Sequence, residues 1–217
     1  GLHHILWEIV DNAIDEAANG FADKVEVVLY KDGSVSVEDN GRGIPTDIHK
    51  QAGVSGVQVV FTQLHAGGKF NNENYSFSGG LHGVGASVTN ALSEWLEVEV
   101  YNKVVYKMRF HSYFDKTRKK MISGEPEAPL EKTKIKTDKH GTFVRFKPDK
   151  EVFETVEFSL ETIAKRLREL AFLNKGITIK LTDLRDDEKF YSKTFKYDGG
   201  LIDYVLYLNE GKTKLYD

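Results

Sequence analysis

The sequence contains no cysteine and only four prolines in 217 residues. Without cysteine the chain can form neither disulfide bonds nor thiolate metal sites. No apolar run approaches the roughly 20 residues that a helix needs to cross a bilayer. No secretory signal is visible, although the chain begins with Gly1, so the natural start of the protein is not evident from the sequence. From these absences we expect a cytoplasmic protein that does not enter a membrane.

The sequence also lacks a large excess of charge of one sign. Thirty basic residues stand against thirty-three acidic ones, which leaves a formal net charge of −3. A free-standing nucleic-acid-binding domain normally has a basic face and a high isoelectric point. The charge balance therefore argues against that class, but it does not exclude DNA contact by another part of a larger protein.

What the sequence does contain is the pattern of an α+β domain. Apolar residues recur at helical spacing in residues 2–20, 53–65, 159–174 and 199–209. Alternating segments predict hairpins in residues 24–39 and 96–110 and single strands in residues 141–148, 177–184 and 190–197. Residues 112–140 show little periodicity, and we expect a long solvated connection with at most one strand. We predict one domain over residues 1–217, with residues 199–217 as its end and the start of a linker. The domain would have two layers, a mostly antiparallel sheet and a layer of helices that covers one face of this sheet.

The first predicted helix carries a polar stripe. His4, Glu8, Asn12 and Glu16 are spaced four apart, so they lie on one helix face. One interpretation is an ordinary solvated face. However, Asn disfavours a helix interior because its side chain competes for backbone hydrogen bonds. A carboxylate and a carboxamide one turn apart also suit a general base and a Mg²⁺ ligand. Both interpretations remain open at this point.

The segment "EDNGRGIP" follows a predicted strand that ends at Asp39. The simplest interpretation is a turn, because Asp-Asn-Gly is strong turn chemistry. A functional alternative is that Asp39 accepts a hydrogen bond from the exocyclic amine of an adenine. Gly41 and Gly43 would then let a flat base approach the backbone closely.

The segment "GGLHGVG", residues 79–85, places four glycines before a predicted helix. It matches neither the dinucleotide-binding fingerprint nor the P-loop pattern. Glycines at this position nevertheless expose backbone N–H groups, and the helix dipole favours a negative charge there. The segment therefore suits a polyphosphate. It also suits the hinge of a mobile lid over residues 65–80, from which Lys69 could reach the phosphates.

Four segments in this order resemble the ATPase domains of the GHKL superfamily: "EIVDNAIDEA", "EDNGRGIP", "SGGLHGVGASVTNALS" and "HGTFVRF". Within it they are similar to bacterial gyrase B subunits and, almost as closely, to ParE subunits of topoisomerase IV. MutL, histidine kinases and the ninety-kilodalton heat-shock chaperone share the superfamily and are more distant. The resemblance covers nearly the whole chain and implies a two-layer α/β sandwich that binds ATP and Mg²⁺.

The resemblance implies a role for each motif residue. It makes Glu8 the general base, His4 its support and Asn12 the Mg²⁺ ligand. It makes Asp39 the adenine-binding acid, with the Thr142 hydroxyl acting beside it through water. Residues around the base would be Glu16 and Arg42 as a flanking pair, with Gly43, Ile44 and Pro45 at the pocket wall. The triphosphate would contact Gly80, Leu81, His82, Gly83, Val84, Gly85 and Ala86.

The resemblance also implies partners. They are ATP, DNA bound through the full complex, gyrase A or ParC in a heterotetramer, and a second copy in an ATP-dependent dimer. We expect the 217-residue chain alone to be monomeric and to hydrolyse ATP slowly or not at all. Two positions depart from the common family pattern: Ser76, where Lys is usual in the lid, and the hairpin tip at Asn102 and Lys103, where Arg is frequent.

Overall fold

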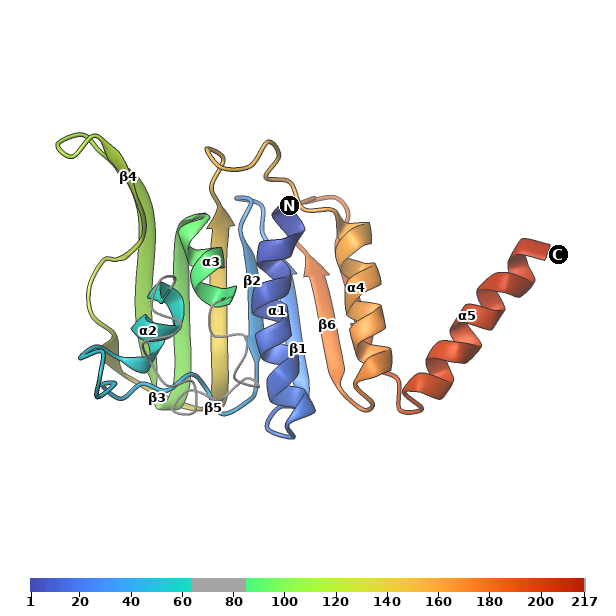
Figure 1. The fold of residues 1–217 in the computed structure, drawn as a ribbon. Coiled ribbons are helices and arrows are strands. Elements are labelled where there is room, and N and C mark those ends of the chain that lie inside the picture. The colour runs from blue at the N-terminus through green and yellow to red at the C-terminus, as the bar shows by residue number, and fades with distance from the viewer. Residues whose placement is uncertain (64–84, 217) are drawn as a thin grey trace.

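A mixed sheet forms one layer of the molecule, and helices cover one of its faces (Figure 1). The computed structural model describes residues 1–63 and 85–216. The elements in chain order are α1 (Leu2–Ala18), β1 (Lys24–Leu29), β2 (Val35–Asp39), α2 (Gly56–Thr62), α3 (Gly85–Ala91), β3 (Ser93–Asp115), β4 (Lys120–Pro126), β5 (Glu131–Pro148), α4 (Leu160–Leu173), β6 (Thr178–Asp183), β7 (Tyr191–Phe195) and α5 (Leu201–Tyr216).

The seven strands are hydrogen-bonded in the order β4-β3-β5-β2-β1-β6-β7. Only β1 and β6 run parallel, and the other neighbouring pairs are antiparallel. Parallel strands cannot be joined by a tight turn, and the segment that leads to β6 contains helix α4, which lies over the sheet (Figure 1). The predicted α+β class, with a mostly antiparallel sheet covered on one face, is confirmed.

The strand β3 reverses direction within itself. Arg109 is ion-paired with Glu97, although twelve residues separate them along the strand. A continuous extended strand would place them about 40 Å apart, at about 3.3 Å per residue. The chain therefore turns back between them, and Lys103 has the left-handed φ of 66° that a tight turn requires. The hairpin predicted around Asn102 and Lys103 is present.

Helix α1 is fixed to the sheet by its apolar face. The residues of α1 that are buried and apolar are Leu2, Ile5, Leu6, Ile9, Val10, Ala13 and Ile14. They recur at helical spacing, and they meet alternate residues of the sheet such as Val25 and Val27 of β1, which are fully buried. Burying one Leu, Ile or Val side chain contributes roughly 1.5–3 kcal/mol. The polar stripe of α1 is therefore carried on a firmly packed element.

Two expectations about secondary structure were wrong. Residues 112–140 are not a solvated connection: they contain the end of β3, the whole of β4 and the start of β5. These strands are exposed on both faces over much of their length, so they show no alternation of apolar and polar residues. The last helix, α5, also continues seven residues beyond the predicted end at residue 209, and it leads away from the sheet (Figure 1).

Several sequence predictions fall outside the described residues. They are the lid segment, Lys69, Ser76 and the glycine segment from Gly79 to Val84. Gly85 and Ala86, the last two residues of the expected phosphate loop, are described and begin α3. Within residues 1–63 and 85–216, no helix combines the length and apolar character needed to cross a membrane.

Candidate functional site

The polar stripe of α1 runs from solvent into the interior. At its exposed end, His4 Nε2 lies 3.1 Å from Glu8 Oε1, with the side chains 66% and 23% exposed. At the other end, Glu16 retains only 3% of its accessible surface. A solvated helix face would leave all four side chains in water. That interpretation therefore fails for the buried end of the stripe.

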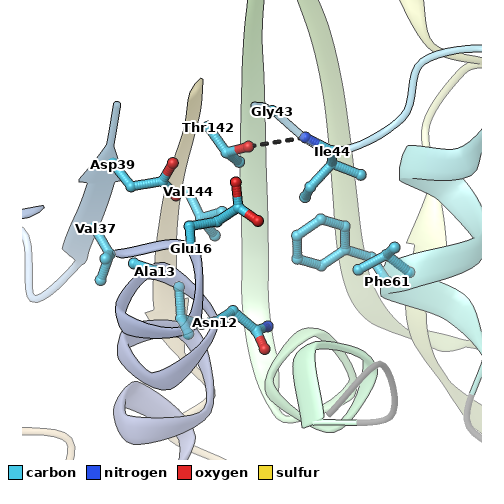
Figure 2. Close-up of a pocket in the computed structure, with 12 residues that line it drawn as sticks. Asn12, Ala13, Glu16, Val37, Asp39, Gly43, Ile44, Phe61, Thr142 and Val144 are labelled. Carbon is cyan, nitrogen blue, oxygen red and sulfur yellow. Dashed lines mark hydrogen bonds between the residues drawn. The ribbon is translucent and has the colours of Figure 1, made fainter. Parts of the chain in front are cut away.

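Asn12 lies midway along the stripe and has an unsatisfied oxygen. Its Oδ1 is buried and accepts no hydrogen bond within the described part of the chain. Leaving a buried acceptor without a partner costs about 1–3 kcal/mol, so such groups are rare in native structures. Figure 2 shows the amide at the edge of a pocket, one helical turn from Glu16. A cation, a water molecule or a ligand donor would satisfy this oxygen.

Asp39 is the last residue of β2 and pairs in the ladder with Thr142 of β5. Burial raises the pKa of Asp39 to about 7. The N–H of Gly41, which donates to Asp39 Oδ1 at 2.8 Å, opposes this rise, and the nearby Glu16 carboxylate adds to it. A hydrogen-bond donor placed in the pocket would favour the ionised carboxylate. Asp39 is therefore a half-buried acceptor whose ionisation depends on what the pocket contains.

Glu16 and Arg42, the two residues to which the resemblance gives a flanking role, form an ion pair. Arg42 Nη2 lies 2.7 Å from Glu16 Oε1, and the Arg42 backbone N–H donates to Glu16 Oε2 at 2.9 Å. The guanidinium also lies 3.8 Å from the ring centre of Phe21. Between the two acids, a Cβ at Gly41 would stand 2.5 Å from Glu16 Oε2 and 3.0 Å from Asp39 Oδ1. Glycine at position 41 thus lets the chain pass between two carboxylates.

The turn after β2 closes against β5. The Ile44 N–H donates to Thr142 Oγ1 at 3.1 Å in a buried hydrogen bond. Gly43 has a φ of +84°, which disfavours any residue with a Cβ. Pro45 does not line the pocket; its carbonyl oxygen packs against Gly56 of α2, where a Cβ would overlap it. The structure therefore gives Pro45 a packing contact, whereas Ile44 faces the pocket.

These elements enclose one pocket between α1, α2 and the sheet (Figure 2). Its lining consists of Ile9, Asn12, Ala13, Glu16, Val37, Asp39, Gly43, Ile44, Val60, Phe61, Thr142 and Val144. The walls are mainly apolar, and the acceptors are gathered at one side. Such a pocket suits a flat heterocycle that carries an amine.

Several of these wall residues were not predicted from the sequence. Val37 and Val144 are two positions from Asp39 and Thr142, so the alternation of side chains along a strand puts them on the same face. That signal could have identified them. Phe61, which is 2% exposed, belongs to α2. Its place depends on how α2 packs against the sheet, for which the sequence contains no local signal.

The end of the glycine segment lies beside Glu8. A Cβ at Gly85 would overlap Glu8 Oε2 and stand 2.8 Å from Glu8 Cδ. The next residue, Ala86, is 1% exposed and packs in the core. Thr89 of α3 donates from its hydroxyl to the Ile5 carbonyl of α1 at 2.7 Å. The start of α3 is thereby held against the Glu8 carboxylate, with no side chain between them.

Comparison with known proteins places this chain in a family. Residues 1–152 match the family described as histidine kinase-, DNA gyrase B-, and HSP90-like ATPase. The whole chain is 52% identical over 218 residues to the DNA gyrase B protein of Thermotoga maritima, and 51% identical over 219 residues to those of Archaeoglobus fulgidus and Staphylococcus aureus. It spans about a third of the length of these relatives, 32%, 33% and 32% respectively.

A solved structure shows the same fold. The crystal structure of the 43K ATPase domain of Thermus thermophilus gyrase B in complex with an aminocoumarin aligns with a TM-score of 0.79 and 38% sequence identity. The alignment covers 96% of this chain and 50% of that one. The chain therefore belongs to the histidine kinase-, DNA gyrase B- and HSP90-like ATPase family, and its sequence and fold are those of a gyrase B-type ATPase domain.

Proposed function

We propose that this chain binds ATP and that its hydrolysis drives the DNA clamp of a type II topoisomerase that negatively supercoils DNA. One observation carries the proposal. Helix α1 links the acidic, apolar-walled pocket at Glu16 and Asp39 with the Glu8 carboxylate beside Gly85. Eight helical residues span about 12 Å, which suits a nucleotide with its base at one end and its terminal phosphate at the other.

We assign the base to the pocket beside Asp39. The half-buried Asp39 carboxylate would accept a hydrogen bond from the exocyclic amine of adenine, and the Thr142 hydroxyl would act beside it through a water molecule. Ile44 and the valines of β2 and β5 would contact the faces of the ring. The ion pair of Glu16 and Arg42 would close the side of the pocket.

We assign hydrolysis to Glu8. Its carboxylate would take a proton from a water molecule as the water oxygen bonds to the γ-phosphorus in line with the breaking bond to the β–γ bridging oxygen. The contact of His4 Nε2 with Glu8 Oε1 at 3.1 Å would orient the carboxylate. Backbone N–H groups of residues 80–86 would bind the phosphates, and Lys69 would supply a positive charge.

Asn12 is the residue we propose for Mg²⁺. Its buried and unpartnered oxygen is a neutral ligand of the kind that hard cations accept. Mg²⁺ is usually held by few protein oxygens together with substrate phosphates and water. This agrees with the described residues, in which no three His, Asp or Glu side chains form a metal-binding group. A bound Mg²⁺ would neutralise charge on the phosphates.

The proposal extends to a full-length protein of the size of the relatives. We propose that the full-length protein dimerises when ATP binds, closes around DNA, and assembles with gyrase A in a cytoplasmic heterotetramer. The 217-residue chain alone is then expected to be monomeric and to turn over ATP slowly. The relatives described above are gyrase B proteins, which favours this assignment over ParE with ParC.

The decisive test combines the full-length protein with gyrase A, relaxed circular DNA and ATP. We expect negative supercoils, detected by gel electrophoresis. Decatenation without supercoiling would instead identify a ParE protein, and ATP turnover with neither activity would indicate a MutL-type or chaperone-type protein. Binding of an ATP analogue to the chain should release or absorb heat in a calorimetric titration. A titration without heat would refute the proposal.

Gly85→Ala tests whether the contact between α3 and Glu8 matters. The added methyl group must displace the Glu8 carboxylate, because it would overlap Oε2. A displacement of about 1 Å can cost on the order of 100-fold in rate, so we expect that loss in ATP turnover of the full-length protein. Gly211→Ala is a matched control, because a Cβ there meets nothing within 4 Å. Turnover unchanged by Gly85→Ala would remove Glu8 from the reacting centre.

A further inference from the structure

The outer part of β3 and the strand β4 form a two-stranded arm, residues 110–126. Figure 1 shows this arm rising beyond the end of the rest of the sheet. Phe110 pairs with Pro126 at its base, and Asp115 pairs with Lys120 next to the turn at its tip. Nothing in the nucleotide site described above uses this arm.

The arm is anchored at its base to α3, which is hydrogen-bonded in turn to α2. The buried Asn90 of α3 donates from Nδ2 to the Gly124 carbonyl at 3.1 Å and to the Phe61 carbonyl of α2 at 2.9 Å. Ser112 Oγ accepts the Gly124 N–H at 2.9 Å. Phe110 is fully buried. These contacts hold the base in place, so the tip stands on a fixed stem.

The tip of the arm is strongly basic. Lys116, Arg118, Lys119 and Lys120 supply four positive charges within five exposed residues. Arg118 has an acidic neighbour, Asp115, at 3.6 Å. The three lysines have no carboxylate partner among the described residues. A chain with a net charge of −3 thus concentrates unpaired positive charge at one projecting point.

At the base of the arm, unlike at its tip, the basic side chain has carboxylate partners. Arg109 is ion-paired with Glu97 and with Glu127 at 2.9 Å, and Tyr113 donates to Glu125 at 2.7 Å. Positive charge is therefore paired with carboxylates where the arm joins the domain and unpaired at the tip. Lysines without an ion-pair partner among the described residues occur elsewhere too, so what distinguishes the tip is its density of charge, four basic residues in five consecutive positions.

Two large apolar side chains lie next to these charges. Phe114 and Met121 pair across the two strands and remain 56% and 46% exposed. Proteins that read the major groove combine contacts of cationic side chains to the phosphates with apolar contact to the thymine methyl group. A two-stranded ribbon is also narrow enough to enter the major groove, which is about 12 Å wide.

We propose that the tip of this arm binds duplex DNA, with Lys116, Lys119 and Lys120 on the phosphate backbone and Phe114 and Met121 against the groove. The choice of DNA among polyanions rests on the proposed function. The unpaired charge, the exposed apolar pair and the fixed stem are observations independent of it.

The test measures, by fluorescence anisotropy, how a short labelled DNA duplex binds to the full-length protein at salt concentrations from about 50 to 200 mM. The arm variant replaces Lys116, Lys119 and Lys120 with Glu. The control replaces Lys150, Lys165 and Lys189 with Glu, which changes the net charge equally at exposed sites far along the chain from the arm. Each phosphate contact contributes roughly 0.9 to the slope of log affinity against log salt. We therefore expect the arm variant to lose about 2–3 units of slope and at least tenfold in affinity at low salt.

Equal losses in the arm variant and the control would overturn the inference, because net charge alone would then explain them. The inference would also be overturned if an acidic polypeptide bound to the arm as tightly as the duplex does, because the partner would then be a protein. Calorimetric titration of both variants with an ATP analogue separates this inference from the proposed function. If nucleotide binding fails in the unmodified protein while the arm variant still loses DNA affinity, only the proposed function is refuted.

Discussion

Glu8→Gln is expected to reduce ATP turnover by about 100-fold to 10,000-fold, the usual contribution of a general base, while ATP binding changes little. Glutamine keeps the size of the side chain and its place beside His4 and Gly85. It cannot accept the proton of the attacking water. The measurement is steady-state phosphate release by the full-length protein, with calorimetric binding of an ATP analogue to the same variant.

His4→Ala is the companion variant. His4 touches Glu8 but is largely exposed, so we expect a smaller loss, caused by a less well oriented carboxylate. If Glu8→Gln hydrolysed ATP nearly as fast as the unmodified protein, another group would have to accept the proton. A loss of nucleotide binding in Glu8→Gln would instead make Glu8 a binding residue.

Asp39→Asn is expected to weaken binding of adenine nucleotides by about 10–100-fold, because one well-placed buried hydrogen bond to a charged group is worth roughly 1.5–3 kcal/mol. The Asn oxygen can still accept the Gly41 N–H, which leaves its NH₂ group towards the pocket. Two donors, this NH₂ group and the adenine amine, would then face each other. Calorimetric titration with an ATP analogue at constant pH measures the loss, and an unchanged affinity would remove Asp39 from the base site.

The same substitution should stabilise the unliganded fold at neutral pH. The pKa of Asp39 is raised from its ordinary value of 3.8 to about 7, so between these values the folded state binds more protons than the unfolded state. The contribution of Asp39 to stability is therefore full below about pH 4 and is lost as the pH rises to about 7. Asn carries no charge and avoids this loss.

Urea unfolding of the two proteins at pH 4 and pH 8 measures this effect. We expect the free energy of unfolding of Asp39→Asn to exceed that of the unmodified protein at pH 8 by a few kcal/mol, and the difference to shrink at pH 4. The control is Asp47→Asn, because Asp47 is an exposed aspartate in the following loop. It should leave the free energy of unfolding unchanged at both pH values. A difference that does not depend on pH would mean that Asp39 is not a neutral acid in the folded state.

The contrast between Asp39 and the arm shows which strands a local sequence pattern can predict. Asp39 closes an alternating strand and precedes Asn-Gly, so the sequence placed it at a strand end and the structure agrees. Residues 110–126 form two strands and a turn, but beyond the buried Phe110 at the base most of their side chains are exposed or half-exposed on both faces. An exposed strand shows no alternation, and it therefore resembled a solvated connection.

The sequence by itself determined the helix that carries His4, Glu8, Asn12 and Glu16, the turn after Asp39 and the α+β class, because helical spacing, strand alternation and turn chemistry are local properties of a chain. Only the tertiary structure decided that Gly85 meets Glu8, that Phe61 enters the pocket wall, and that desolvation raises the pKa of Asp39 to about 7. These are consequences of packing between segments far apart in the chain, and burial shifts a pKa only after such packing has removed the solvent.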